Sequence, residues 1–179
     1  MIFETERLYF REIIPADADA MFELDADPEV HRFLGKHPIE TIEQAIAQIH
    51  FIRQQYDDNG VGRLAIIEKE SDQFIGWGAF KLITECVNGH QNFHDLGYRF
   101  LKRYWGKGYA TEAAKASIKY GFNYLKLPVM YAIADVDHLA SRKVLEKCGF
   151  LNEGVFEYDG TPHIWYTLNR PKRLMGDGF

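Results

Sequence analysis

The chain has 179 residues, of which 46% are hydrophobic and 26% charged, and its formal net charge at pH 7 is −5. This composition predicts one globular domain over residues 1–179, and two cysteines are too few for a disulfide framework. The acidic balance argues against nucleic-acid binding as the main role, residues 1–13 lack the features of a signal peptide, and no apolar run is long enough for a membrane span, so we expect a soluble cytoplasmic protein.

The first half of the chain predicts one strand, two helices and a hairpin. Residues 7–12 alternate in polarity, as in a strand, and a short helix follows Pro15 over residues 17–24. Thr41 and Gln44 form a capping-box pattern at the start of a second helix, which Gly60 and Gly62 end. Residues 63–83 contain two β-rich runs around a polar turn at residues 70–73, which indicates a hairpin.

The second half predicts alternating strands and helices that finish in a hairpin. We expect a strand over residues 93–101, a helix over 110–127, a strand over 129–136 and a helix over 139–147. Pro128 would stop the first helix, and Gly149 would cap the second in the left-handed conformation. Asp159 and Gly160 predict a tight turn between the last two strands, although Pro162 obscures their register.

This order of elements predicts a mixed α/β (α+β) fold with a mostly antiparallel sheet flanked by helices. A helical crossover would join the two central strands, which end near residue 101 and start near residue 129.

The stretch between the strand ending near residue 101 and the next helix contains Gly106 and Gly108, preceded by Arg103. Backbone N–H groups at a helix start lack intrahelical partners and attract anions, above all phosphate. Glycine lets the backbone approach such an anion closely, and Arg103 and Lys107 can add positive charge. The alternative is that these glycines only turn the chain. Neither the Walker loop nor the dinucleotide-binding fingerprint is present, so any diphosphate here would be held in another way.

Two segments resemble signatures of the GNAT acetyl-CoA-dependent N-acetyltransferases. "RYWGKGYATEA" resembles their R/Q-x-x-G-x-G/A pyrophosphate loop, and "DHLASRKVLEKCGF" resembles their second signature, N-x-x-S followed by a helix. "ETERLYFREI" and "FIGWGAF" also match the RimJ/RimL-type branch, which acetylates ribosomal-protein N-termini, and its small-molecule relatives. The resemblance covers nearly the whole chain.

This resemblance implies the GNAT acyl-CoA N-acyltransferase fold, in which the central strands splay apart around the thioester. It also implies acetyl-CoA as cofactor, a primary amine as acceptor and no metal; dimers are frequent among relatives, so a homodimer is compatible with the chain. In the family, the pyrophosphate binds the glycine loop and the pantetheine arm pairs with the preceding strand. Carried over to this sequence, the coenzyme-binding residues are Phe100, Leu101, Lys102, Arg103, Gly106, Lys107, Gly108, Tyr109 and Ala110.

The second signature supplies two further candidates, for catalysis and for coenzyme binding. Ser141 falls on the serine proposed in this branch to protonate the coenzyme A thiolate, and the following helix lacks the tyrosine that other branches use. A serine in a first helical turn is also a common cap. His138 stands where the family usually has an asparagine that holds the coenzyme arm or a water. It could instead face solvent.

The candidate general base is Asp95, on the strand facing the splayed gap. Its neighbour His94 is the alternative, because adjacent strand side chains point to opposite faces. Asp95 could equally be a solvated charge, and Glu85 and His163 are weaker candidates. Acceptor specificity is expected in residues 25–38 and 84–92, the least patterned segments. Two other readings stay open: a non-catalytic acyl-CoA-binding module and a structural domain.

Overall fold

A computed structural model of the chain describes residues 1–172. Its eight strands form one sheet in the order β1-β2-β3-β4-β5-β6-β8-β7. The strands are β1 (Phe3–Glu4), β2 (Leu8–Glu12), β3 (Leu64–Glu68), β4 (Gln73–Ile83), β5 (Phe93–Phe100), β6 (Val129–Asp135), β7 (Leu151–Tyr158) and β8 (Thr161–Asn169). The α-helices are α1 (Ala18–Ala26), α2 (Ile42–Asn59), α3 (Tyr109–Asn123) and α4 (Leu139–Lys147), with short 3-10 turns η1 (Pro15–Asp17), η2 (Val30–Phe33) and η3 (Lys102–Tyr104).

The predicted mixed α/β fold is confirmed, although one strand and the end of one helix differ from the prediction. The two-residue strand β1 was not predicted, because so short a segment has no periodicity to detect. Helix α3 ends at Asn123 rather than at residue 127. Lys126 adopts a left-handed φ of 57°, and the Leu127 N–H donates to the Gly121 carbonyl, which closes the helix before Pro128 is reached.

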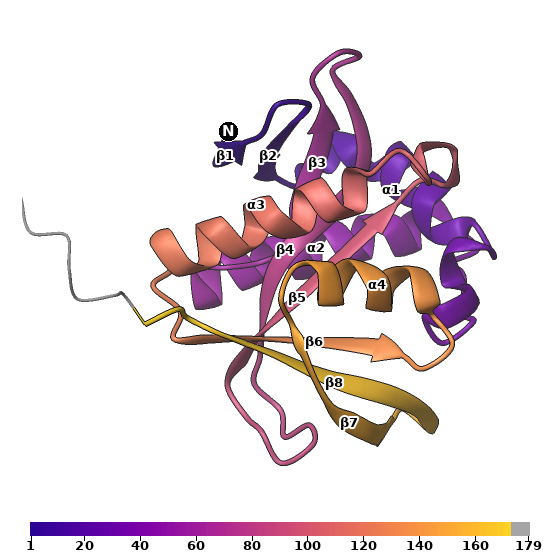
Figure 1. Cartoon of the computed structure of the whole chain (residues 1–179). Helices are drawn as coiled ribbons and strands as arrows, with labels where there is room; N and C mark the ends of the chain where they lie inside the picture. The colour runs from indigo at the N-terminus through magenta and orange to yellow at the C-terminus, as the bar shows by residue number, and fades with distance from the viewer. Residues whose placement is uncertain (173–179) are drawn as a thin grey trace, which may run out of the picture.

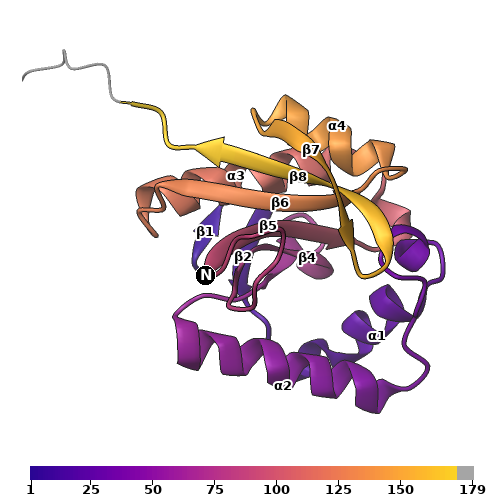
Figure 2. The same ribbon diagram turned by 90° about the horizontal axis from the view of Figure 1, so that it is seen from below.

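The helices cover the sheet on both faces. Figure 2 shows α1 and α2 on one side of the sheet and α3 and α4 on the other. Helix α3 lies close to the sheet because it presents small residues: Ala113 and Ala114 are buried, and a Cβ at Gly121 would lie 2.6 Å from the Met130 side chain. The start of α3 lies near the end of β5, since only residues 101–108 separate the two elements.

The central strands β5 and β6 separate along their length. β5 pairs with β4 along its whole length, from Phe93 to Phe100, but with β6 it forms one parallel pair, Asp95 with Tyr131. Beyond that pair the two strands diverge (Figure 1). Helix α3 makes the predicted crossover between them. The far end of β5 therefore has one edge on β4 and the other on a gap.

The last two strands form the predicted hairpin. Asp159 and Gly160 have φ values of 52° and 75°, the left-handed pair that a two-residue turn needs. Pro162 lies near the turn, opposite Glu157, where the loss of one backbone donor disturbs the ladder little. Within residues 1–172, no helix combines the length and the apolar character needed to cross a membrane.

Candidate active site

The glycine loop between η3 and α3 forms the first part of the site. Gly106 and Gly108 have φ values of 74° and 81°, so both occupy the left-handed region that favours glycine. A Cβ at Gly106 would meet no atom within 4 Å. Gly106 is therefore needed for its backbone conformation, and it leaves open space in front of the loop.

The backbone donors of this loop have no partners within the described part of the chain. None of the N–H groups of residues 106–111 donates to a protein acceptor there, whereas the next donor, Glu112 N–H, bonds the Gly108 carbonyl at 3.1 Å. These groups lie at the positive end of the α3 macrodipole. A run of free donors at a helix start is a geometry suited to a phosphate group.

The two cations expected at the loop are placed differently from one another. Arg103 is half exposed and forms an ion pair with Glu23 of α1, so its charge is shared with that helix. The Lys107 ammonium lies 5.0 Å from the centre of the Tyr104 ring. Lys107 thus keeps its charge at the loop, while Arg103 also ties the loop to α1.

The end of β5 provides a free backbone edge next to the loop. The Leu101 N–H donates to the Ile75 carbonyl at 3.0 Å, towards β4. Since backbone donors alternate in direction along a strand, the Phe100 N–H points away from β4, towards the gap. The Phe100 carbonyl accepts a bond from Trp105 Nε1 at 2.8 Å, and the side chains of Phe100 and Leu101 are buried. Lys102 follows in η3 and is exposed.

Ser141 lies in the first turn of α4 and contacts β5 through a tyrosine. The helix begins after His138, and no side chain makes a capping bond there. Ser141 Oγ lies 3.3 Å from the hydroxyl oxygen of Tyr98, and the Tyr98 hydroxyl also lies 3.2 Å from the Ser141 carbonyl oxygen. Burial raises the pKa of Tyr98, so its hydroxyl keeps its proton. The sequence alone assigns Tyr98 no catalytic role.

His138 faces the 3-10 turn η2. Its ring stacks on Phe33, with ring centres 4.6 Å apart, and burial lowers its pKa, so it is neutral at pH 7. Beside this contact lies a cleft of about 320 Å³ between residues 32–36 and the loop from β6 to α4. The cleft is lined by Arg32, Phe33, Lys36, Asp135 and Asp137.

Asp95 is the counter-ion of a buried arginine. Its carboxylate lies 2.5 Å from Arg63 Nη2, and its backbone carbonyl accepts a second bond from Arg63 Nη1 at 2.7 Å. Both side chains are about nine-tenths buried. Desolvation lowers the pKa of Arg63, and the Asp95 charge opposes that shift. To act as a base, Asp95 would have to exchange this partner.

The other base candidates differ from Asp95 in burial and in the element that carries them. His94 lies next to Asp95 on β5, and the alternation of the strand places its side chain on the opposite face. Burial lowers the pKa of His94. Glu85 is exposed in the loop after β4, and His163 pairs with Asp135 across β6 and β8. Within residues 1–172, no group of three or more His, Cys, Asp or Glu side chains is arranged to hold a metal ion.

Comparison with known proteins identifies the fold around this site. The model of the acetyltransferase (GNAT) domain matches residues 7–151. The chain belongs to the GNAT family of acetyltransferases. It is an N-acetyltransferase, as its relatives are named.

Two curated relatives and one solved structure illustrate this kinship. An uncharacterized N-acetyltransferase of Bacillus subtilis, YoaA, is 32% identical over 177 residues, which cover 96% of this chain and 98% of the relative. The spermidine N(1)-acetyltransferase of Escherichia coli is 43% identical over 138 residues, covering 77% and 69% respectively. The crystal structure of a GNAT-family acetyltransferase from Bacillus anthracis superposes with a TM-score of 0.76 at 25% identity, covering 93% of this chain and 96% of that one.

Proposed function

We propose that this GNAT enzyme transfers the acetyl group of acetyl-CoA to a primary amine, with both substrates bound at once. The observation that carries the proposal is the run of unpaired N–H groups over residues 106–111, beside the gap between β5 and β6. A diphosphate suits the unpaired N–H groups, and the extended thiol-bearing arm of the cofactor suits the gap. The membership in an acetyltransferase family supports the same donor.

The cofactor would occupy the loop and the gap in turn. Its pyrophosphate binds the N–H groups around Gly106, Lys107 and Gly108, and its pantetheine arm runs along residues 100–102 in the place of a missing strand. This puts the acetyl carbonyl near the Phe100 N–H, which faces the gap. A backbone donor there would stabilise the oxyanion that forms when the amine attacks.

The chemistry needs a neutral amine and a proton for the departing sulfur. The amine lone pair attacks the thioester carbon, the C–S bond breaks, and the nitrogen loses a proton as the amide forms. We assign Ser141 as the donor to the thiolate, with the Tyr98 hydroxyl orienting it. We assign His138 rather than Asp95 as the group that accepts the amine proton, because His138 is neutral and stacks on Phe33, which lines the cleft, whereas Asp95 is bound to Arg63.

The acceptor would enter through the cleft beside His138. Asp135 and Asp137 give its wall two carboxylates that suit a cationic amine, and Arg32 and Lys36 line the same cleft. The relative named for spermidine supports a small amine. A protein N-terminus, as in the RimJ/RimL-type branch, is the second candidate, so the assay must test both kinds of acceptor.

The test is an acetyl-transfer assay that reads released thiol with a panel of polyamines, amino acids, amino sugars and N-terminal peptides. We expect turnover with at least one amine, and a fall in kcat of about 10²-fold or more for Ser141→Ala if Ser141 supplies the proton. Tyr98→Phe should lower kcat less, and the double variant should resemble Ser141→Ala, because the two residues act as one unit.

The competing function is a non-catalytic acyl-CoA-binding module. It predicts that coenzyme A raises the melting temperature while no amine in the panel releases thiol. Failure of saturating coenzyme A to raise the melting temperature would contradict both functions. Undiminished turnover in Ser141→Ala would remove the assigned acid and leave the cofactor site intact.

A further inference from the structure

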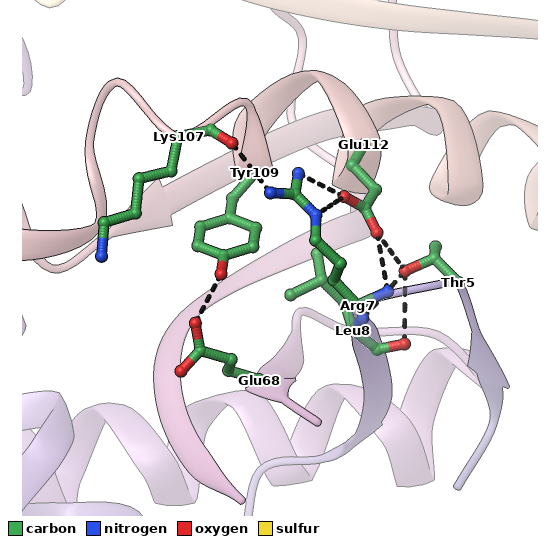
Figure 3. A network of polar contacts seen from close by, with 7 residues as sticks. All are labelled: Thr5, Arg7, Leu8, Glu68, Lys107, Tyr109 and Glu112. Atoms are coloured by element: carbon green, nitrogen blue, oxygen red, sulfur yellow. Dashed lines mark hydrogen bonds and ion pairs between the residues drawn. The ribbon is translucent and has the colours of Figure 1, made fainter. Parts of the chain in front are cut away.

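The N-terminal segment reaches the glycine loop through Arg7, which precedes β2. Figure 3 shows its guanidinium between the loop and α3. Arg7 Nη1 donates to the Lys107 carbonyl at 3.0 Å, and Nε and Nη2 contact Glu112 Oε2 at 2.7 and 2.5 Å. One arginine thus holds both the loop and the first turn of α3, about a hundred residues away in sequence.

The bond to the Lys107 carbonyl fixes a peptide plane. In a trans peptide, the carbonyl of one residue and the N–H of the next point in opposite directions. Because Arg7 holds the Lys107 carbonyl, the Gly108 N–H must point away from Arg7. Gly108 is one of the residues whose N–H has no acceptor among residues 1–172. Arg7 therefore sets the direction of a donor at the proposed phosphate site.

Glu112 holds Arg7 in this position. Its Oε1 accepts bonds from the Thr5 hydroxyl at 2.6 Å and from the Arg7 N–H at 3.1 Å. Although partial burial opposes the shift, these bonds and the Arg7 charge keep the pKa of Glu112 below its ordinary value. Figure 3 also shows Tyr109 beside this pair: Arg7 lies 4.3 Å from the ring centre, and the Tyr109 hydroxyl donates to Glu68 Oε1 at 2.5 Å.

The charges of this network matter for an anionic ligand. A carboxylate in the first turn of α3 would repel a diphosphate bound at the same helix end. Arg7 neutralises Glu112 and leaves the partial positive charge of the helix start unopposed. The segments "ETERLYFREI" and "TEA" are thus in contact in the fold through Arg7 and Glu112, and neither segment alone indicates this contact.

We propose that Arg7, held by Glu112, is a positioning residue that orients the Gly108 N–H towards the pyrophosphate of the cofactor. The inference rests on the proposed function, since it takes the loop as the pyrophosphate site. It assigns to Arg7 a role in donor binding alone, with no role in attack on the thioester or in acceptor choice.

The test measures binding of coenzyme A and of pantetheine, which lacks the pyrophosphate, by isothermal titration. Arg7→Gln should weaken coenzyme A binding by about 10-fold, the effect of losing a hydrogen bond made by a charged group, and should leave pantetheine binding unchanged. Glu112→Gln should act in the same direction. Arg7→Lys should not restore affinity, because one ammonium cannot reach the Lys107 carbonyl and Glu112 together.

Arg11→Gln is the matched control, since Arg11 lies four residues further along the chain, on β2, and makes a two-bond ion pair with Asp17, away from the loop. It should leave coenzyme A binding unchanged. With no ligand, Arg7→Gln should melt within about 4 °C of the wild type, because a partly exposed ion pair contributes little to stability. In turnover assays KM for acetyl-CoA should rise while kcat and the KM of the amine stay constant.

Three results would overturn the inference. Unchanged coenzyme A affinity in both Arg7→Gln and Glu112→Gln would show that the network does not act on the cofactor. Equal losses for coenzyme A and pantetheine would indicate a general distortion, and full rescue by Arg7→Lys would show that charge alone suffices. If wild-type protein binds pantetheine as tightly as coenzyme A, the loop does not hold the pyrophosphate, and the cofactor placement under the proposed function fails as well.

Discussion

Asp95→Asn separates a structural role of this carboxylate from a catalytic one. The change keeps the size of the side chain and removes its charge. In the structure Asp95 is 7% exposed and faces Arg63, which is also 7% exposed and donates to the carboxylate and to the Asp95 carbonyl. The variant would therefore leave a buried guanidinium without its counter-ion.

The expected loss of stability follows from that burial. Removing one partner of a buried ion pair costs about 3–5 kcal/mol, and the asparagine oxygen can still accept one bond, so we expect about 3 kcal/mol. For a domain of this size the melting temperature should fall by about 6–12 °C. Replacing both partners with apolar residues, Arg63→Met with Asp95→Leu, should restore much of the loss because no unpaired charge remains.

Urea denaturation gives the free energy of unfolding, and acetyl transfer at a temperature where the variant is folded gives kcat. A structural role predicts lower stability with kcat per folded molecule close to wild type. A general base would instead lose about 10²–10⁴-fold in kcat. An unfolding free energy within about 0.5 kcal/mol of wild type would refute the reasoning from burial.

Two further predictions concern the core and the pH dependence. Gly121→Ala puts a Cβ 2.6 Å from the Met130 side chain. Although alanine has the better helix propensity, we expect the free energy of unfolding, measured by urea denaturation, to fall by about 1–3 kcal/mol. A variant as stable as the wild type would show that α3 can shift to make room for the methyl group. Three histidines have pKa values lowered by burial, so the unfolded chain binds more protons than the native one, and stability should fall as pH drops below about 6.5. These histidines are His31, His94 and His138. Unfolding curves at several pH values should show that stability depends less on pH in His138→Asn than in the wild type.

Local chemistry explains why most of the fold could be predicted. The Thr41 and Gln44 capping box, the Gly60 helix end and the Asp159–Gly160 turn each act over a few residues, and all three occur where expected. The end of α3 could not be predicted as well. Pro128 limits how far a helix can run, but the helix closes through the left-handed Lys126, and a lysine does not signal that conformation as a glycine would.

The candidate site divides in the same way. The glycine loop was predictable because its spacing and its place between a strand and a helix are local features. Tyr98 was not, because its contact with Ser141 joins residues 43 positions apart. The ion pair between Arg63 and Asp95 was missed for the same reason, and it changes what Asp95 is available to do. The roles of Ser141, His138 and the coenzyme-binding residues stay predictions until the assays above are done.

The single backbone pair between β5 and β6 divides the sheet into two mechanical units, β1 to β5 and β6 with β8 and β7. A small rotation of one unit against the other would break few backbone hydrogen bonds, since each unit keeps its own ladder. Coenzyme A bound in the gap would contact both units and restrict that rotation. Amide hydrogen exchange should then slow on both sides of the gap when coenzyme A binds, well beyond the atoms it touches.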